Sequence, residues 1–216
     1  MLLSYKEFVT ANKRDDQRNN DITHFFSRHF VNIFAFPLYR IGLSPNQVTL
    51  IFIFTGLVGG ILSFYNFLMS AYVLWRIHII IDMADGSVAR VTKQFSSLGN
   101  TLDKIGHHLI YPIYWIGFLY ASDLLYQHPL FSIIFFAIAS SQWTIKHLFE
   151  AKKDRPQATS IIKRIIANIF GIEGFFLLII IQVYFNVFDS LYLIIFMTLT
   201  NFILLTNKAL SLIKNA

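Results

Sequence analysis

The sequence predicts an all-α integral membrane protein with six transmembrane helices, preceded by an amphipathic helix at the membrane interface. Composition is the first observation behind this prediction, because 55% of the 216 residues are hydrophobic, only 14% are charged, and the mean hydropathy is +0.55. A soluble domain of this length carries more charge. The second observation is that apolar runs long enough to cross a bilayer recur along the chain. We therefore expect lipid to surround most of the protein.

Six apolar runs of roughly 18 to 25 residues, the length that a helix needs to cross a bilayer, follow one another. The second and third runs contain ionisable residues, which would shorten them in a hydropathy scan. Six crossings place both termini on the same side of the membrane. The expected spans are 47–65, 67–90, 98–122, 129–150, 165–186 and 189–210.

The segments between the spans alternate in charge. Those near Tyr65, Asp123 and Asn186 contain no lysine or arginine. By the positive-inside rule the basic segments face the cytoplasm, and we expect both termini there. This placement accounts for the net charge of +6, and we expect no nucleic acid among the partners. The basic segments hold Lys6, Lys13, Arg14, Arg18 and Arg28, then Arg90 and Lys93, then Lys152, Lys153, Arg155, Lys163 and Arg164, then Lys208 and Lys214.

The chain divides into a cytoplasmic N-terminal segment, residues 1–43, and a membrane domain, residues 44–216. The first twenty residues are polar and lack the apolar core of a signal peptide, so we expect them to be retained. Residues 21–42 mix aromatic and basic side chains and contain Pro37. We expect a helix that lies in the interface and that Pro37 interrupts.

Two glycines of the first span, Gly56 and Gly60, stand four residues apart. Small residues at this spacing are typical of a face that packs closely on another helix. We therefore expect a helix neighbour at this face and no ligand.

Residues 82–108 concentrate ionisable side chains where the second span ends and the third begins. At about 100° per residue, Asp82 and Asp85 fall on one face of the first of these helices. Gly86 and Ala89 lie beside them on the same face. This face therefore carries two carboxylates one turn apart, with small residues next to them.

The third span continues the pattern, because Gly99, Asp103 and His107 recur every four residues and form a single stripe. Paired ions at the membrane surface are one explanation of such charges. Three aligned carboxylates repel one another unless a cation is present, and buried charges in lipid are usually functional. Oxygen ligands without any cysteine favour Mg²⁺, with Mn²⁺ or Ca²⁺ as alternatives. Two such ions suit a phosphoryl transfer.

The residues Asp82-x2-Asp85-Gly86-x2-Ala89-Arg90-x8-Gly99-x3-Asp103-x3-His107 resemble the signature of the CDP-alcohol phosphatidyltransferase family, membrane enzymes of phospholipid synthesis. The family pattern ends in aspartate where this chain has His107, and every other signature position matches. The segment "SPNQVT" at 44–49 resembles the Pro-Asn-x-x-Thr start of the family's first span. The motifs cover roughly residues 44–110, and the six-span layout extends the resemblance over most of the chain.

The resemblance implies a six-helix fold with a polar cavity open to the cytoplasm, in a homodimer. It implies an enzyme in which an acceptor hydroxyl attacks the β-phosphorus of a CDP-alcohol, such as CDP-diacylglycerol, and releases CMP. Carried over by position, three aspartates would bind two Mg²⁺ or Mn²⁺ ions: Asp82, Asp85 and Asp103. The nucleotide and its phosphates would be held by Gly86, Ala89, Arg90 and Gly99, with Asn46 and Thr49 in the same pocket.

His107 is where the sequence departs from the family, whose last aspartate is usually assigned as the general base. Imidazole has an unperturbed pKa of about 6.5, which suits a base near neutrality. It brings no negative charge, so a cation would be held less tightly. Three interpretations stay open: a working histidine base, a lost base in a protein that binds CDP-alcohol without turnover, and an engineered substitution that traps substrate.

Two further polar residues within the spans are candidates for the acceptor side of the site. Glu173 in the fifth span has a similar depth to His107, so we hypothesise that it orients His107 or contacts the acceptor. A pair between Glu173 and Arg76 is the alternative. His78 stands one turn before Asp82 on the same face and would line the deeper cavity. No residue pattern identifies the acceptor alcohol.

An ion-conducting or transport protein is a rival class, because buried acids also form ion paths. That class does not explain the glycine and arginine positions of the stretch at 82–108. The sequence therefore favours a membrane-embedded, metal-dependent transferase.

Overall fold

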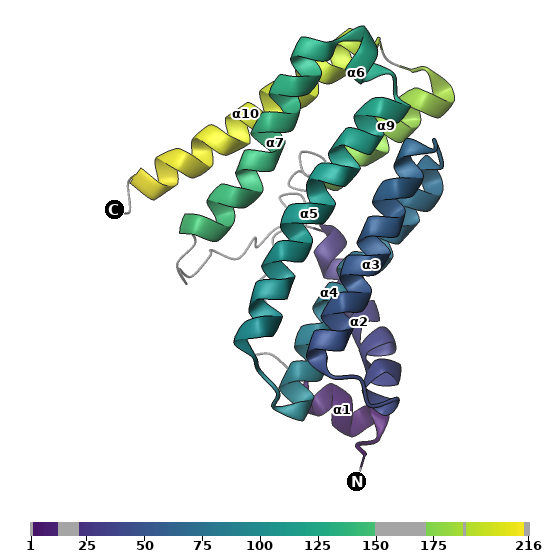
Figure 1. Cartoon of the computed structure of the whole chain (residues 1–216), viewed down its shortest axis with the longest axis vertical. Helices are drawn as coiled ribbons and strands as arrows, with labels where there is room; N and C mark the ends of the chain where they lie inside the picture. The colour runs from purple at the N-terminus through teal and green to yellow at the C-terminus, as the bar shows by residue number, and fades with distance from the viewer. Residues whose placement is uncertain (1, 13–21, 150–171, 188, 214–216) are drawn as a thin grey trace.

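The computed structural model of this chain describes residues 2–12, 22–149, 172–187 and 189–213. All regular structure in these ranges is helical (Figure 1). The N-terminal helices are α1 (Tyr5–Ala11) and α2 (Ile22–Arg40), and the central ones are α3 (Pro45–Phe64), α4 (Leu68–Thr92) and α5 (Ser97–Ala121). The others are α6 (Leu124–Gln127), α7 (Pro129–Phe149), α9 (Ile172–Phe185) and α10 (Ser190–Ile213).

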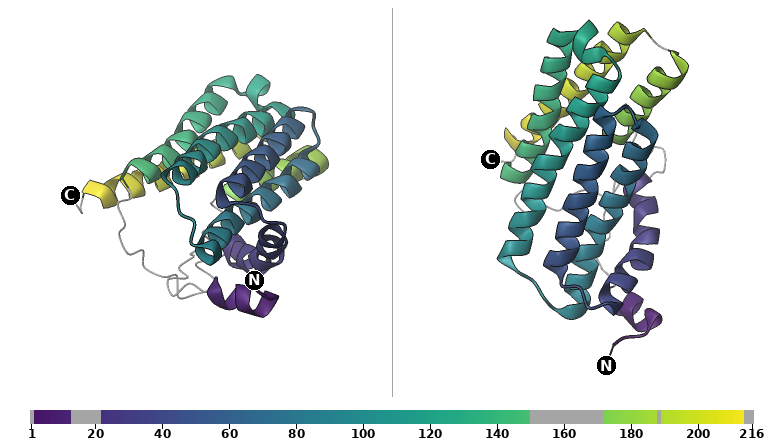
Figure 2. Two further views of the ribbon diagram at one scale, coloured as in Figure 1. Left: turned by 60° about the horizontal axis from the view of Figure 1, so that its bottom comes forward. Right: turned by 45° about the vertical axis from the view of Figure 1, so that its right-hand side comes forward.

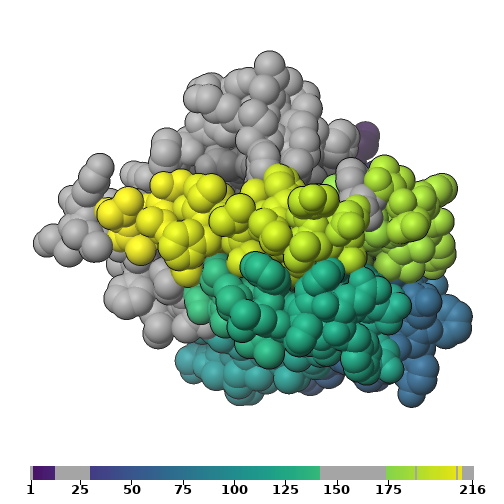
Figure 3. Space-filling model, turned by 90° about the horizontal axis from the view of Figure 1, so that it is seen from above, coloured from purple at the N-terminus to yellow at the C-terminus, as the bar shows by residue number. Residues whose placement is uncertain are grey.

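The long helices α3, α4 and α5 stand side by side and alternate in direction (Figures 1 and 2). The start of α3, the end of α4 and the start of α5 therefore meet at one end of the molecule, near α1. Helices α7 and α10 pack on each other, and Figure 3 shows α10 in yellow lying across the opposite end. The stretch 82–108 thus lies at the α1 end.

Local sequence explains where these helices begin and end. Ser44 caps α3 through a capping box with Gln47, and Pro45 occupies the first turn, where its missing N–H costs nothing. Ser96 caps α5 by accepting the Gly99 N–H at 2.9 Å. Helix α4 ends at Lys93, which adopts the left-handed conformation with φ 58°. These three caps fix the loop ends that surround the predicted site.

The glycines of α3 lie against α5, as the sequence predicts. A Cβ on Gly56 would come within 2.5 Å of the Ile110 side chain, and one on Gly60 would come equally close to Ile113. The backbones can approach this closely only because both positions lack side chains. Gly56 and Gly60 are therefore packing residues.

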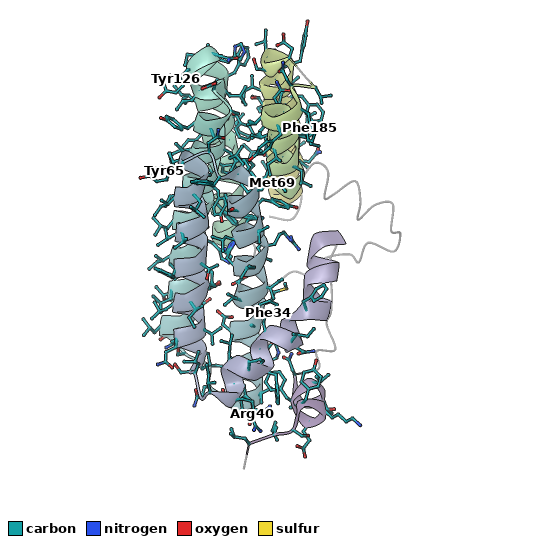
Figure 4. All side chains as sticks on the ribbon, turned by 90° about the vertical axis from the view of Figure 1, so that its right-hand side faces the viewer. Phe34, Arg40, Tyr65, Met69, Tyr126 and Phe185 are labelled. Atoms are coloured by element: carbon teal, nitrogen blue, oxygen red, sulfur yellow. The ribbon has the colours of Figure 1, made fainter. Side chains whose placement is uncertain are left out.

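The interior is rich in aromatic rings. Phe176 of α9 stacks on Phe118 at 4.4 Å between ring centroids, and it also contacts Trp75 and Trp115 at 5.0 and 4.7 Å. These contacts join α9 to α4 and α5. Large apolar side chains also point outward, including Tyr65, Met69, Tyr126 and Phe185, which are 54–74% exposed (Figure 4).

Two helices in the described ranges are long and apolar enough to cross a membrane by length and composition, Pro45–Phe64 and Ser190–Asn207. The other expected spans coincide with α4, α5, α7 and α9 to within a few residues where the structure describes them. Residues 165–171 of the fifth expected span lie outside the described ranges.

The N-terminal segment differs from expectation in two ways. The prediction that Pro37 interrupts the helix is wrong, because α2 continues through it to Arg40. Proline removes one helical hydrogen bond, and the packing of α2 along α4 offsets that loss. In addition, α1 is a helix that the hydropathy pattern did not predict. A capping box between Ser4 and Glu7 starts it, and the bonds from Ser4 hold the pKa of the Glu7 carboxyl below its usual range.

Candidate active site

Three ionisable side chains from α4 and α5 form a compact cluster. Nε2 of His107 lies 3.2 Å from Oδ1 of Asp103 and 3.5 Å from Oδ1 of Asp82. Asp103 and His107 are one turn apart on α5, and Asp82 faces them from α4. The His107 side chain is 8% exposed and Asp103 is 36% exposed, so the cluster extends from the interior toward an opening.

Close packing of α5 on α3 holds the cluster in place. A Cβ on Gly106 would come within 2.7 Å of the Phe52 ring, so this glycine allows the contact. The Phe52 ring lies 5.4 Å from the imidazole of His107, and the Tyr111 ring stacks on that imidazole at 5.4 Å between centroids. Two aromatic rings therefore pack against the imidazole.

The cluster fits a divalent cation. Asp82, Asp103 and His107 each offer one ligand atom, and these atoms all lie within 4.8 Å of one another. Two carboxylates and one imidazole form a mixed oxygen and nitrogen donor set, which suits ions such as Mn²⁺ and also accepts Mg²⁺. The metal ligands expected from the sequence were the three aspartates alone, so the position of His107 adds a candidate donor.

Asp85 lies one turn beyond Asp82 and has a different neighbour. The Thr49 hydroxyl on α3 donates to Oδ2 of Asp85 at 2.7 Å and also bonds to the Pro45 carbonyl at 3.1 Å. Asp85 is thereby held beside the cluster, at the wall of the adjoining cavity. Thr49, a weaker candidate in the sequence, thus directly contacts a signature carboxylate.

A cavity of about 340 Å³ adjoins the cluster, between α3, α4, the α4–α5 loop and α5. Seven residues of the sequence-predicted site line it: Asn46, Thr49, Asp85, Gly86, Ala89, Gly99 and Asp103. The loop residues Gln94, Phe95 and Ser96 also line it, together with Pro45 and Asn100. Sequence reasoning missed this loop, although its position between two signature halves was a usable signal.

Ser96 joins the starts of α3 and α5 across the cavity. Its hydroxyl donates to Oδ1 of Asn46 at 2.9 Å and accepts the N–H of Gly99. A Cβ on Gly99 would come within 2.7 Å of that Asn46 oxygen. The space beside Gly99 is thus taken by Asn46 in this structure, where the sequence predicts room for the nucleotide.

Arg90 is absent from the described residues that line this cavity. Its Nε donates to Oδ1 of Asn12 at 3.0 Å, and its Nη2 donates to Ser87 Oγ at 3.1 Å. The guanidinium lies against Gly86, where a Cβ would be 3.2 Å from Nη1. Arg90 is therefore adjacent to the cavity wall and is held by a residue outside the signature.

His78 lies in the aromatic interior below the cluster and is fully buried. Its Nδ1 donates to the Trp75 carbonyl at 2.8 Å. Its Nε2 has no hydrogen-bond partner among the described residues. The ring of Phe52 contacts both His78 and His107, at centroid distances of 6.2 and 5.4 Å. An orienting or acceptor role for His78 stays a prediction.

Two other expectations fall where side chains are not described. Glu173 lies on α9, but its side chain is outside the described part, so its proposed contact with His107 stays a prediction. The basic run that begins at Lys152 also lies outside the described residues.

A larger cavity, of about 540 Å³, opens at the opposite end of the bundle. Its lining includes Gln127 at the end of α6 and the connecting residues Asp123, Asn186 and Asp189. These side chains are exposed, and none of them belongs to the signature. The smaller cavity is therefore the better candidate for the active site, because it adjoins the cluster of carboxylates and imidazole.

The fold is similar to that of a solved protein structure. The crystal structure of phosphatidylinositol phosphate synthase from Mycobacterium tuberculosis with CDP-DAG bound superposes with a TM-score of 0.58 at 18% sequence identity. The match covers 86% of this chain and 91% of that one, and it shows that the two share a fold. No match was found among curated proteins.

The helical fold is therefore that of a synthase which was crystallised with CDP-DAG bound. The sequence profile described as CDP-alcohol phosphatidyltransferase matches residues 42–209. The chain belongs to the CDP-alcohol phosphatidyltransferase family.

Proposed function

We propose that this protein transfers a substituted phosphate from a CDP-alcohol of the CDP-diacylglycerol type to an acceptor hydroxyl and releases CMP. The observation that carries the proposal is the cluster of Asp82, Asp103 and His107 at the edge of a cavity lined by signature residues. The CDP-DAG bound to the M. tuberculosis synthase, which has the same fold, supports this class of donor.

The cavity is the proposed donor site. Its volume of about 340 Å³ is in the range of small-molecule sites, which start near 300 Å³. The N-termini of α3 and α5 border it at Pro45 and Ser96, and helix N-termini favour phosphate through their N–H groups and dipoles. The diphosphate would therefore lie between these helix starts and the carboxylates.

Asp82, Asp85 and Asp103 are the proposed ligands of two Mg²⁺ or Mn²⁺ ions, with His107 Nε2 facing the same space. Bound cations would neutralise the diphosphate and the CMP leaving group. The protein's part is to hold the carboxylates at fixed positions, and the Thr49 hydroxyl does this for Asp85.

His107 is the proposed general base, so in this proposal the aspartates alone hold the cations and Nε2 of His107 stays free to accept a proton. The acceptor hydroxyl gives its proton to the imidazole while the hydroxyl oxygen bonds to the β-phosphorus of the CDP-alcohol. The bond from that phosphorus to the bridging oxygen breaks, and CMP leaves with this oxygen. Phe52 and Tyr111 keep the ring in one orientation, so that Nε2 points toward Asp82 and Asp103.

We also propose that α3, α4, α5, α7, α9 and α10 cross the membrane, with both termini and the site on the cytoplasmic side. The alternation of basic and uncharged connecting segments supports this topology. The outward-pointing apolar side chains would then face lipid or the second copy of a homodimer.

A second candidate is a homologue that binds CDP-alcohol without turnover. One observation favours it, namely that Nε2 of His107 contacts both Asp82 and Asp103. In that position the imidazole competes with a cation for the same carboxylates.

The experiment uses the full chain purified in detergent, with CDP-diacylglycerol, Mg²⁺ or Mn²⁺, and a mixture of glycerol phosphate, serine and inositol phosphate. CMP and a new phospholipid should form in equal amounts, and mass spectrometry of the lipid identifies the acceptor. Binding of the donor with no CMP formed would reject turnover and leave the second candidate.

A further inference from the structure

Asn12, at the C-terminal end of α1, connects the N-terminal segment to the signature arginine. Its Oδ1 accepts a hydrogen bond from Nε of Arg90 at 3.0 Å. Its Nδ2 donates to Oδ1 of Asn32 on α2 at 2.7 Å. Because Asn32 takes the nitrogen side of the amide, the oxygen side faces Arg90. The amide is thus a bridge between α2 and α4.

The Asn12 bridge contacts the guanidinium group of Arg90, which lies next to the proposed donor cavity. Arg90 also donates from Nη2 to Ser87 Oγ at 3.1 Å. Contacts on two different nitrogens fix the plane of a guanidinium group. The third nitrogen, Nη1, lies beside Gly86, which lines the cavity. Asn12 and Ser87 therefore both help to fix the orientation of Arg90 beside the cavity wall.

Helix α1 is itself firmly held, so it can act as a support. Phe8 is fully buried and packs on Phe36 and Tyr39 of α2, at centroid distances of 5.6 and 5.3 Å. The Leu3 N–H donates to the Tyr39 hydroxyl at 3.1 Å. Figure 4 shows α1 beside the end of α2 that carries Arg40. The seven-residue helix is thus docked by an aromatic anchor.

We propose that Asn12 is a positioning residue, which orients Arg90 to bind the phosphates of the CDP-alcohol donor. The inference rests on the proposed function and adds α1 to the donor site. Asn12 lies 78 residues from Arg90 in the sequence and outside the signature, and hydropathy gives it no role. Its effect is on donor binding, because the amide contacts Arg90 and none of the residues of the Asp82, Asp103 and His107 cluster.

The test measures CMP release against CDP-diacylglycerol concentration in full-length variants. Asn12→Ala should raise the donor KM on the order of tenfold, as loss of one hydrogen bond to a charged group does, while kcat stays within about twofold. Asn12→Asp keeps an oxygen acceptor and should restore KM to within about twofold of wild type. The double variant Asn12→Ala/Arg90→Ala should have the KM of Arg90→Ala alone, because Asn12 acts through Arg90.

Ser132→Ala is the matched control. This variant removes a buried hydrogen bond, from Ser132 Oγ to the Leu124 carbonyl, at the opposite end of the bundle. It should lower the thermal midpoint by an amount similar to Asn12→Ala and leave the donor KM unchanged. If Ser132→Ala raises the donor KM as much as Asn12→Ala does, the rise in both variants comes from a general loss of stability. That result would overturn the inference.

The outcome also separates this inference from the proposed function. If the wild type turns over CDP-diacylglycerol and Asn12→Ala has the same donor KM as the wild type, Asn12 has no positioning role. The proposed transferase activity is then unaffected. Additive effects of the Asn12 and Arg90 substitutions overturn the positioning role as well. If the wild-type chain binds CDP-diacylglycerol but releases no CMP, the proposed function fails, and the donor Kd of wild type and Asn12→Ala decides the positioning role instead: an equal Kd overturns it.

Discussion

Nε2 of His107 lies 3.2 Å from a carboxylate oxygen of Asp103, one turn earlier on α5. At position 107 the family signature has a fourth aspartate. In this chain an imidazole ring therefore replaces a carboxylate beside the proposed metal site. The same nitrogen is 3.5 Å from Asp82. The consequences for proton transfer and for metal binding can be measured separately.

Replacing His107 by alanine removes the proposed base and leaves the cavity lining intact. A general base contributes about 10²- to 10⁴-fold to a rate, so kcat for CMP release should fall by at least about 100-fold. The Kd for the donor, measured by titration calorimetry, should change by less than about threefold. An unchanged kcat would rule out His107 as the base.

The affinity for Mg²⁺ should rise when His107 becomes aspartate. The substitution adds a negative charge and an oxygen donor beside Asp82 and Asp103, and Mg²⁺ prefers oxygen ligands. We expect His107→Asp to bind Mg²⁺ about tenfold more tightly, by calorimetry in the absence of nucleotide. Asp103→Asn is the opposing control and should weaken binding. Equal Mg²⁺ affinity in wild type and His107→Asp would place position 107 outside the metal's surroundings.

The bond between Thr49 and Asp85 predicts a matched pair of variants on α3. Thr49→Val keeps the shape of the side chain and removes the 2.7 Å bond to the carboxylate, which is worth about 1.5–3 kcal/mol for a charged group. The donor KM should rise severalfold or more. Thr55→Val, on the same helix, removes only a bond to the Ile51 carbonyl and should leave KM unchanged. Equal effects of both variants would argue against a role for Thr49 in the site.

Helix boundaries were predictable from the sequence because apolar runs and capping residues have local causes. Ser44, Pro45 and Gln47 mark the start of α3, and the run that follows has the length of a membrane span. The signature also placed Asp103 and His107 together, since a four-residue spacing aligns side chains on a helix, and the short connection between α4 and α5 keeps Asp82 at the same end of the bundle. For these elements, short-range patterns were enough.

The features that the sequence did not predict depend on contacts between segments that are far apart in the chain. Asn12 and Arg90 are 78 residues apart, and no periodicity relates them. Ser96 and Asn46 likewise meet only because α3 and α5 start at the same end of the bundle. The continuation of α2 through Pro37 reflects packing against α4, which the local preference of proline does not reveal.

Cysteine labelling tests the topology directly, because the chain contains no cysteine. In intact cells, a membrane-impermeant maleimide should label Asp123→Cys, in the α5–α6 connection on the proposed outer side. Lys93→Cys, in the loop beside the donor cavity, should react only after the membrane is permeabilised. Labelling of both variants in intact cells would contradict the proposed placement of the site at the cytoplasmic face.

The central claim is that the wild-type chain is a working transferase with histidine at position 107. The most direct measurement compares CMP release from CDP-diacylglycerol by wild type and by His107→Asp, under the same metal and acceptor conditions. We expect wild type to release CMP, so that the reaction does not require the substitution. Release by His107→Asp alone, with donor binding intact in wild type, would contradict this claim and identify a binding protein that has lost its base.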